Sequence, residues 1–476
     1  MQDNGFKSIQ KATGLAILIP AKMRNALRVW KKAYENESDW LTKEVESLNL
    51  PSTVANEIAR LTTLECEIKV SGSPRAKFID EQLEFLRTKI KNTTELACAL
   101  GGIIFKPYYS DGKIMIDYVP QDEVYPFKYD GNGKITGAIF PTYKIMNDRI
   151  YTRLEIHDFT TEKYVIQNKA FVSKNTRLID GVVADIGYEI PLTAVEEWAD
   201  LDYELIINGM DQPLFSSFMI PIANNIDRKC PLGMSVYSKA IKEFKKADKQ
   251  WARIDWEYDS KETALDVDEN YLATDMYGSK ILPDGKKRLY RTYSGASFTG
   301  ENLFKYFSPE IRDQSFFNGL DKIFKRIEYN CNLAYGTISD PMNTDKTATE
   351  IKTSKQRSYQ LVKDIQGALQ SALEDLIVAM DEICEIYNLE VSGNCNVTFK
   401  WDDSIVIDAE TEKLQDMQEV NNGLLPKWKY KMKWQGLTEE QAKAELQEDD
   451  STPSGLIYSD NSINQRTNDR VLNEED

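Results

Sequence analysis

The chain of 476 residues contains a single histidine, His157. Mechanisms that pair a histidine with a serine or cysteine nucleophile, and metal sites built from several histidines, would all depend on that residue. It lies in the alternating segment Arg-Leu-Glu-Ile-His-Asp-Phe, a pattern typical of a strand, so we interpret it as an ordinary sheet histidine. No GxxxxGK[ST] phosphate loop occurs, which argues against a P-loop ATPase.

The sequence also lacks paired cysteines and long apolar runs. The six cysteines are scattered without a CxxC pair, so we expect reduced thiols rather than a disulfide framework. No stretch approaches the roughly 18 apolar residues of a membrane-spanning helix, and the best run, 15–20, is too short for a secretory signal. We therefore expect a soluble protein, made in a cytoplasm, with no membrane partner.

Positive charge is scarce, because 59 lysines and arginines face 76 acidic residues and the net charge is −17. Gripping nucleic acid requires basic patches that replace phosphate counterions, so this balance argues against a tight nucleic-acid binder. It does not argue against a conduit for DNA, since an acidic wall repels phosphates and lets the duplex slide past.

Aspartate and glutamate side chains are the remaining candidates for catalytic groups. One cluster consists of Asp266, Asp268 and Glu269, and a second consists of Asp402 and Asp403. Either could hold Mg²⁺ and support a metal-dependent phosphodiesterase. In a chain with this many acids such clusters arise by chance, so we predict no enzyme, no catalytic or metal site and no cofactor.

The first half of the chain has the pattern of an α+β domain. Apolar spacing predicts a helix from Phe78 to Ile90 that continues, after a break, through Leu96 to Leu100 and ends at Gly101. Strand-like segments then flank turn sequences at 110–112, 130–133 and 160–162, which predicts antiparallel hairpins. Further strand-like runs continue to 218–222.

Long helices dominate the second half. We predict one from Ser235 to about 258, a β-rich insert over 264–308, and a second helix over 314–335. After a loop without periodicity, Thr347 and Glu350 form a capping box for a third helix of about 40 residues, roughly 60 Å long. Its apolar stripe consists of Leu361, Ile365, Leu369, Leu373, Leu376, Met380, Ile383 and Tyr387.

The end of the chain is simpler. We expect a strand over 397–401 and two short helices, the second capped by Thr438. The polar tail beyond 449 is predicted to be disordered.

The order of these elements resembles that of the portal proteins of tailed bacteriophages, over about residues 15–446. Four local sequences are also similar to that family: Pro231-Leu232-Gly233-Met234-Ser235, Asn318-Gly319-Leu320-Asp321 continuing to Ala334-Tyr335-Gly336, Thr347-Ala348-Thr349-Glu350-Ile351 and Gly423-Leu424-Leu425-Pro426.

The resemblance implies an α+β subunit of a ring with a central channel. Its expected parts are an N-terminal segment and α+β wing (1–234), a first stem helix (235–263), a small β-rich clip (264–312), a second stem helix (313–336), a tunnel loop (337–346), a long kinked wing helix and strand (347–400), a short helical crown (401–448) and an acidic tail (449–476).

The resemblance also implies a function. It predicts a structural protein that forms a ring of about twelve copies at one capsid vertex and passes double-stranded DNA during packaging and ejection. Expected partners are the packaging ATPase (large terminase), head-completion or adaptor proteins, and the major capsid and scaffolding proteins. The protein would be assembled in the host bacterial cytoplasm and reside in the virion.

Site residues follow from the same resemblance. The tunnel-loop residues Asp340, Asn343, Asp345 and Lys346 are expected to face the DNA, and Gly367 is expected to kink the long helix. The stem cations are Lys242, Lys249, Arg253, Lys322 and Arg326.

The sequence allows more than one role for the basic row on the first stem helix and more than one function for the chain. The basic row from Lys242 to Arg253 would face phosphates or the acidic residues of a neighbouring subunit, and the acidic composition favours the second. Trp251 and Trp256 are expected to be packing residues. Two other functions compete with the portal interpretation: the metal-dependent nuclease, and a large oligomeric virion scaffold without a DNA channel.

Overall fold

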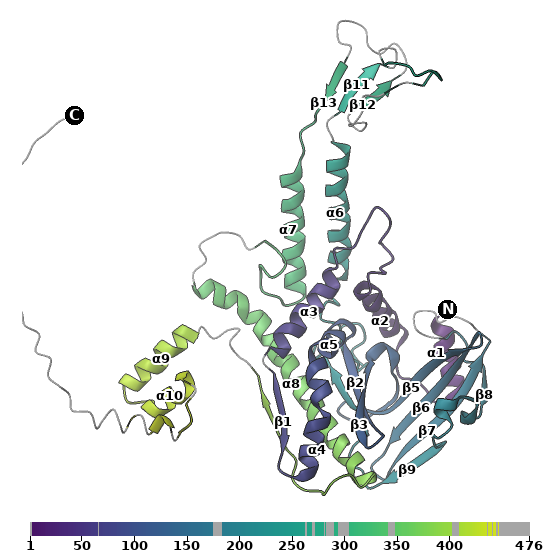
Figure 1. Ribbon diagram of the computed structural model, residues 1–476, viewed down its shortest axis with the longest axis vertical. Helices are drawn as coiled ribbons and strands as arrows, with labels where there is room; N and C mark the ends of the chain where they lie inside the picture. The colour runs from purple at the N-terminus through teal and green to yellow at the C-terminus, as the bar shows by residue number, and fades with distance from the viewer. Residues whose placement is uncertain are drawn as a thin grey trace, which may run out of the picture. The chain divides into compact units, whose positions relative to one another are not determined.

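The chain divides into two units, residues 1–406 and 407–476, which are described separately (Figure 1). The computed structural model describes residues 2–64, 66–174, 183–261, 264–268, 272–279, 281, 290–293, 304–340, 348–401, 409–435, 437–439, 441–443 and 446. None of the helices in these ranges is both long and apolar enough to cross a membrane. All six cysteines are free thiols, as predicted.

Helices occupy most of the first hundred residues of the first unit. They are α1 (Gln2–Thr13), α2 (Ala21–Tyr34), α3 (Leu50–Thr63), α4 (Pro74–Gln82) and α5 (Glu84–Leu100). The predicted end is confirmed, because α5 ends at Gly101, which has a φ of +94°. The break predicted after Ile90 is wrong, because α5 is continuous from Glu84 to Leu100 and the break lies at Leu83, between α4 and α5. A Cβ atom there would lie 2.4 Å from the carbonyl oxygen of Gly233, so both the backbone angle and the space require glycine.

Antiparallel sheets follow the helices and confirm the α+β class. The largest has six strands in the order β4-β5-β6-β7-β8, with β9 also paired to β7. A second sheet has the order β10-β2-β3, and β1 pairs with β14. The strands are β1 (Glu67–Ser71), β2 (Gly102–Ser110), β3 (Lys113–Pro120), β4 (Tyr125–Tyr129), β5 (Ile135–Met146), β6 (Arg149–Phe159), β7 (Lys163–Ser173), β8 (Tyr188–Ile190), β9 (Glu204–Asn208), β10 (Ser216–Met219) and β14 (Asn396–Lys400). The three predicted hairpins are β2–β3, β4–β5 and β6–β7.

The long third helix is α8 (Ala348–Ile386), which spans 39 residues as predicted. Its stripe from Leu361 to Ile383 is buried, and the helix packs against β2, β10, α3 and α4. Tyr387 was wrongly included in the stripe: it follows the helix, is 49% exposed and stacks on Tyr109 at 4.2 Å between ring centroids. The helix is unbroken at Gly367, where an added Cβ would meet no atom within 4 Å, and the kink there stays a prediction.

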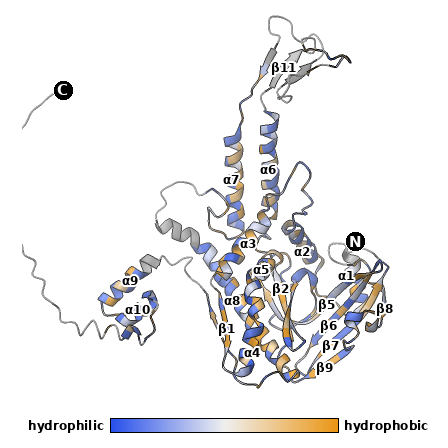
Figure 2. Ribbon diagram, in the orientation of Figure 1, coloured by the Kyte–Doolittle hydropathy of each residue, from blue (hydrophilic) through white to orange (hydrophobic). Residues whose placement is uncertain are grey.

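Two other helices, α6 (Ile241–Ser260) and α7 (Asp313–Asn330), lie side by side (Figure 1). Both mix apolar with hydrophilic residues along their length (Figure 2). The predicted start of α6 at Ser235 is wrong, because the residues that precede Ile241 form turns there. Buried Tyr237 lies in these turns, and its hydroxyl donates to the carbonyl of Trp30 at 3.0 Å.

The predicted end of α7 is also corrected. The helix stops at Asn330 instead of residue 335, and Asn332 takes a φ of +56°, which no helix continues through. The insert between α6 and α7 is β-rich as predicted. Its described strands are β11 (Ala264–Asp268), parallel to β12 (Tyr290–Tyr293) and antiparallel to β13 (Phe304–Phe307).

The second unit contains α9 (Ala409–Asn421) and α10 (Lys427–Gln435). Both Lys433 and the indole of Trp434 donate to the carboxylate of Asp416, at 2.7 and 2.8 Å. The sequence pattern did not predict α10; the second short helix was predicted to begin at Thr438. Thr438 does start a helical turn, since its backbone carbonyl accepts the N–H of Ala442 at 2.8 Å. The tail beyond 449 lies outside the described residues.

Candidate functional site

The paired helices α6 and α7 form the centre of the candidate site. Ile254 on α6 and Leu320 and Ile327 on α7 are buried. Trp251, predicted to be a packing residue, lies edge-on to Phe317 with ring centroids 6.4 Å apart. The same prediction is wrong for Trp256, which is 70% exposed because it lies on the side of α6 away from this seam.

An ion pair joins the helices where both enter the insert. The guanidinium of Arg312 donates from Nε and Nη2 to the Glu257 carboxylate at 3.1 and 2.9 Å, and the Arg312 backbone N–H donates at 3.3 Å. These hydrogen bonds outweigh burial and lower the pKa of Glu257 to about 2. The carboxylate is therefore ionised at neutral pH and ties the end of α6 to the start of α7.

A second buried carboxylate, Glu328, holds the chain that follows α7. It accepts backbone N–H groups from Gly336, Ile338 and Ser339 at 3.1, 2.7 and 2.9 Å, and the Ser339 hydroxyl at 2.8 Å. Glu328 is fully buried, and the described contacts satisfy its oxygens with donors from the backbone and one hydroxyl. The first residues of the predicted tunnel loop are thus fixed to α7.

Asp248 on α6 fixes another segment, the connection 35–49 between α2 and α3. Its two carboxylate oxygens accept the indole N–H of Trp40 at 2.8 Å and the backbone N–H of Leu48 at 3.0 Å. Burial raises the pKa of Asp248. This connection lies beside α6 in Figure 1.

The predicted stem cations are all on the exposed surface of these helices. Lys242, Lys249 and Arg253 are on α6, and Lys322 and Arg326 are on α7. Arg326 lies 3.5 Å from the buried carboxylate of Glu243. Four acidic residues of the two helices are buried: Glu243, Asp248, Glu257 and Glu328. The outer surface of the helix pair is therefore rich in cations. Sequence reasoning found the cations and missed the buried acids.

The predicted acidic sites are only partly described. Asp340 is exposed, and its backbone N–H donates to Asp321 at 3.3 Å. Asp266 and Asp268 lie two positions apart on β11. The other predicted residues lie outside the described part of the chain: Asn343, Asp345, Lys346, Glu269, Asp402 and Asp403. Among the residues that are described, no group of three histidine, cysteine or acidic side chains could hold a metal ion.

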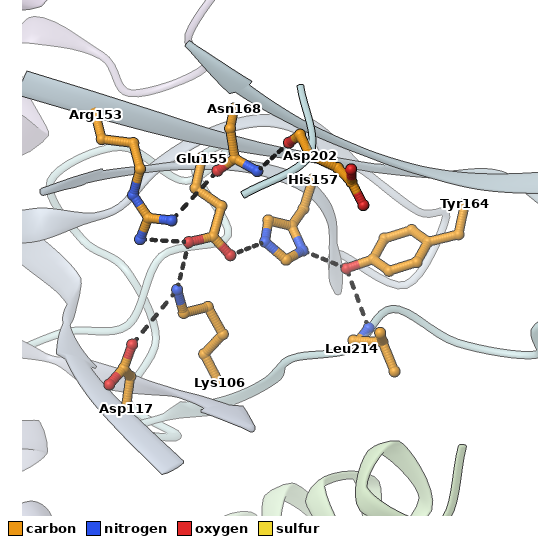
Figure 3. Close-up of polar contacts among 9 residues, drawn as sticks. All are labelled: Lys106, Asp117, Arg153, Glu155, His157, Tyr164, Asn168, Asp202 and Leu214. Atoms are coloured by element: carbon orange, nitrogen blue, oxygen red, sulfur yellow. Dashed lines mark hydrogen bonds and ion pairs between the residues drawn. The ribbon is translucent and has the colours of Figure 1, made fainter. Parts of the chain in front are cut away.

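The only histidine belongs to a buried network between the two large sheets (Figure 3). His157 is a strand residue, as predicted, and its Nε2 lies 2.7 Å from Glu155. Lys106 and Arg153 also contact Glu155, at 2.8 and 3.2 Å. The hydroxyl of Tyr164 contacts Nδ1 of His157 and accepts the backbone N–H of Leu214 at 3.2 Å.

Electrostatics fix the charges of this network. Burial alone would raise the pKa of Glu155, but Lys106, His157 and Arg153 hold it well below its usual range. Burial lowers the pKa of His157, so the ring is neutral at pH 7, with Nε2–H donating to Glu155 and Nδ1 accepting from Tyr164. Every polar atom of the imidazole is engaged, so the network stabilises the sheets and offers no free base for catalysis.

Comparison with known proteins places the chain in a family. A family model described as "Phage portal protein, SPP1 Gp6-like" matches residues 31–454. The chain therefore belongs to the SPP1 Gp6-like family of phage portal proteins, which is a structural family and not an enzymatic one. The predicted resemblance and the portal-like α+β fold are confirmed.

A search of curated proteins finds no match. Among solved structures, a chain of the "Neck of native GTA particle computed with C12 symmetry" is similar with a TM-score of 0.43 and 10% identity. The similarity covers 89% of this chain and 96% of that chain. At this TM-score it supports no further conclusion.

Proposed function

We propose that this chain is the subunit of a ring-shaped channel of about twelve copies at one capsid vertex, through which double-stranded DNA is packaged and ejected. Membership in the portal family over residues 31–454 carries this proposal. The ring would reside in the virion after assembly in the host cytoplasm.

The proposed parts keep the predicted order. Residues 235–263 and 313–336 form the stem, and α6 and α7 make up most of it. Residues 264–312 form the clip, and 337–346 the tunnel loop. The remaining parts are the wing (1–234), the long wing helix and strand (347–400), the crown (401–448) and the tail (449–476).

Two buried carboxylates support this division. Glu257 and its partner Arg312 lie where the stem meets the clip, and Glu328 holds the start of the tunnel loop at the other end of α7. A motor pulling on the DNA would load the clip and the loop, and both are tied back to the stem by charge-assisted hydrogen bonds. Asp340, Asn343, Asp345 and Lys346 would face the DNA.

The clip is proposed to dock the packaging ATPase and later the head-completion proteins, while the wing and crown contact capsid and scaffolding proteins. The ATPase would supply the energy, because the chain contains no phosphate loop of its own.

Replacing 264–312 by a short glycine-serine linker tests the docking role. We expect rings that still assemble but no longer bind purified large terminase in a pull-down. Terminase binding equal to that of the unaltered ring would remove the clip assignment.

A further inference from the structure

One face of α6 carries a row of cations that have no acidic partner among the residues that the structure describes. Within the described residues, none of these side chains forms an ion pair, although all are exposed. The row, called here the basic stripe, consists of Lys242, Lys245, Lys246, Lys249 and Arg253. Their spacing puts them on one side of the helix over about 16 Å. The chain has a net charge of −17, so five cations on one helix face without an ion pair to any described residue differ from its overall acidic character.

The connection 35–49 carries the complementary charge. Glu37, Glu44 and Glu46 are exposed and form no ion pair within the described residues. They are called here the acidic edge; Lys43 is the only cation in the connection. The connection has a defined shape, because its Trp40 and Leu48 both donate to Asp248, and Ser47 donates to Asn36 at 2.7 Å.

The connection meets α6 at the level of the basic stripe. Asp248, which holds the connection that carries the acidic edge, lies within the run of the basic stripe and directly precedes Lys249. Adjacent helix residues point about 100° apart, so the connection and the stripe occupy different sides of α6. They do not pair with each other inside one chain, which leaves both available to other copies.

We infer that the basic stripe of one copy docks against the acidic edge of the next copy around the ring. Two different complementary surfaces on one chain make a head-to-tail contact, and such contacts close into a ring when the rotation between copies allows it. Because the connection meets α6 at the level of the stripe, this contact would hold neighbouring copies at the same position along the ring axis. This inference rests on the proposed ring, and it assigns the stripe to a neighbouring copy instead of to DNA phosphates.

Charge reversal tests the assignment. One variant carries Lys242→Glu, Lys249→Glu and Arg253→Glu, and a second carries Glu37→Lys, Glu44→Lys and Glu46→Lys. Each alone places like charges across the contact, so mass photometry should show at least a tenfold loss of rings, with helix content unchanged by circular dichroism. A matched control reverses three exposed lysines elsewhere, Lys7→Glu, Lys113→Glu and Lys163→Glu, and should assemble normally.

Mixing the two reversed variants gives the decisive result. Each copy of one then meets the opposite charge on its neighbour, so we expect rings of alternating copies from two preparations that form none alone. Rings formed by the stripe-reversed variant alone, or no rings in the mixture, would overturn this inference. Failure of the unaltered chain to form rings under every condition would overturn the proposed function together with it.

Discussion

The carboxylate of Glu257, near the end of α6, accepts two hydrogen bonds from the guanidinium of Arg312, the last residue before α7, at 3.1 and 2.9 Å. This pair closes the base of the insert, because the 54 residues between the two partners leave and return at the same point. The base of the insert is held by this bidentate pair together with Lys261, whose Nζ donates to the carbonyl of Glu310 at 3.3 Å.

Substituting Glu257→Gln should loosen this base. Because the uncharged amide pairs poorly with a guanidinium, we expect faster hydrogen exchange at 304–312 and at the end of α6, measured by mass spectrometry. Glu310→Gln is the matched control, since that exposed side chain is not part of the pair. Equal exchange rates in the two variants would show that the pair does not hold the insert.

The stability that the Glu257–Arg312 pair contributes should depend on pH. The pKa of Glu257 is lowered to about 2, below its ordinary value of about 4.3, so the pair contributes stability above pH 4.3 that is lost as pH falls toward 2. Protection at 304–312 should persist at pH 4. Its loss already at pH 5 would contradict the assignment.

Glu328 should govern the start of the tunnel loop. Glu328→Ala removes the acceptor for three backbone N–H groups and one hydroxyl, so we expect the free energy of unfolding to fall by about 1–3 kcal/mol and exchange at 336–339 to accelerate. Glu328→Gln keeps one carbonyl acceptor and should lose less. Asp321→Asn affects the longer contact to Asp340 and the ion pair with Lys325 at 2.6 Å but leaves 336–339 held by Glu328, so it serves as the control. Unchanged exchange in Glu328→Ala would contradict this role.

The single histidine predicts a pH dependence of stability. The pKa of His157 is lowered in the folded chain, so below about pH 6.5 the unfolded chain binds the proton more readily and stability falls as pH drops. In urea unfolding at pH 7.5 and 5.5, the unaltered chain should lose more stability than His157→Gln. No other histidine contributes, so equal losses would mean that His157 titrates normally.

Removing 341–346 tests the tunnel loop. The deletion leaves 336–339 held by Glu328, so we expect rings to assemble while DNA packaging or retention in an in vitro assay fails. Failure of ring assembly would make the segment structural instead, and normal packaging would remove its role at the DNA.

Local sequence patterns predicted most of the helices and strands. Contacts between residues that are distant in the sequence set several of the helix ends, which the patterns did not predict. The hairpin turns are specified by neighbouring residues, so their positions could be predicted from the sequence. The end of α5 at Gly101 could be predicted as well, although the close approach of Gly233 to that glycine could not. Ser235 looks like a helix cap, yet its Oγ accepts the N–H of Tyr237 in a turn, and α6 starts six residues later.

The site depends on pairs that no periodicity connects. Asp248 meets Trp40 across 208 positions, and Glu257 meets Arg312 across 55. Burying a carboxylate costs free energy unless hydrogen bonds or an ion pair compensate it. The partners that compensate these acids are distant in the sequence, so their burial could not be predicted from local patterns. The portal resemblance came instead from the order of the elements together with four local sequences, and the family match confirms that resemblance.

The proposed ring around a channel is tested most directly by mass photometry of the purified chain, followed by electron-microscopy class averages. We predict a closed ring of about a dozen 54.6 kDa subunits with a central hole. A stable, compact dimer that persists when scaffolding and capsid proteins are added would contradict the claim.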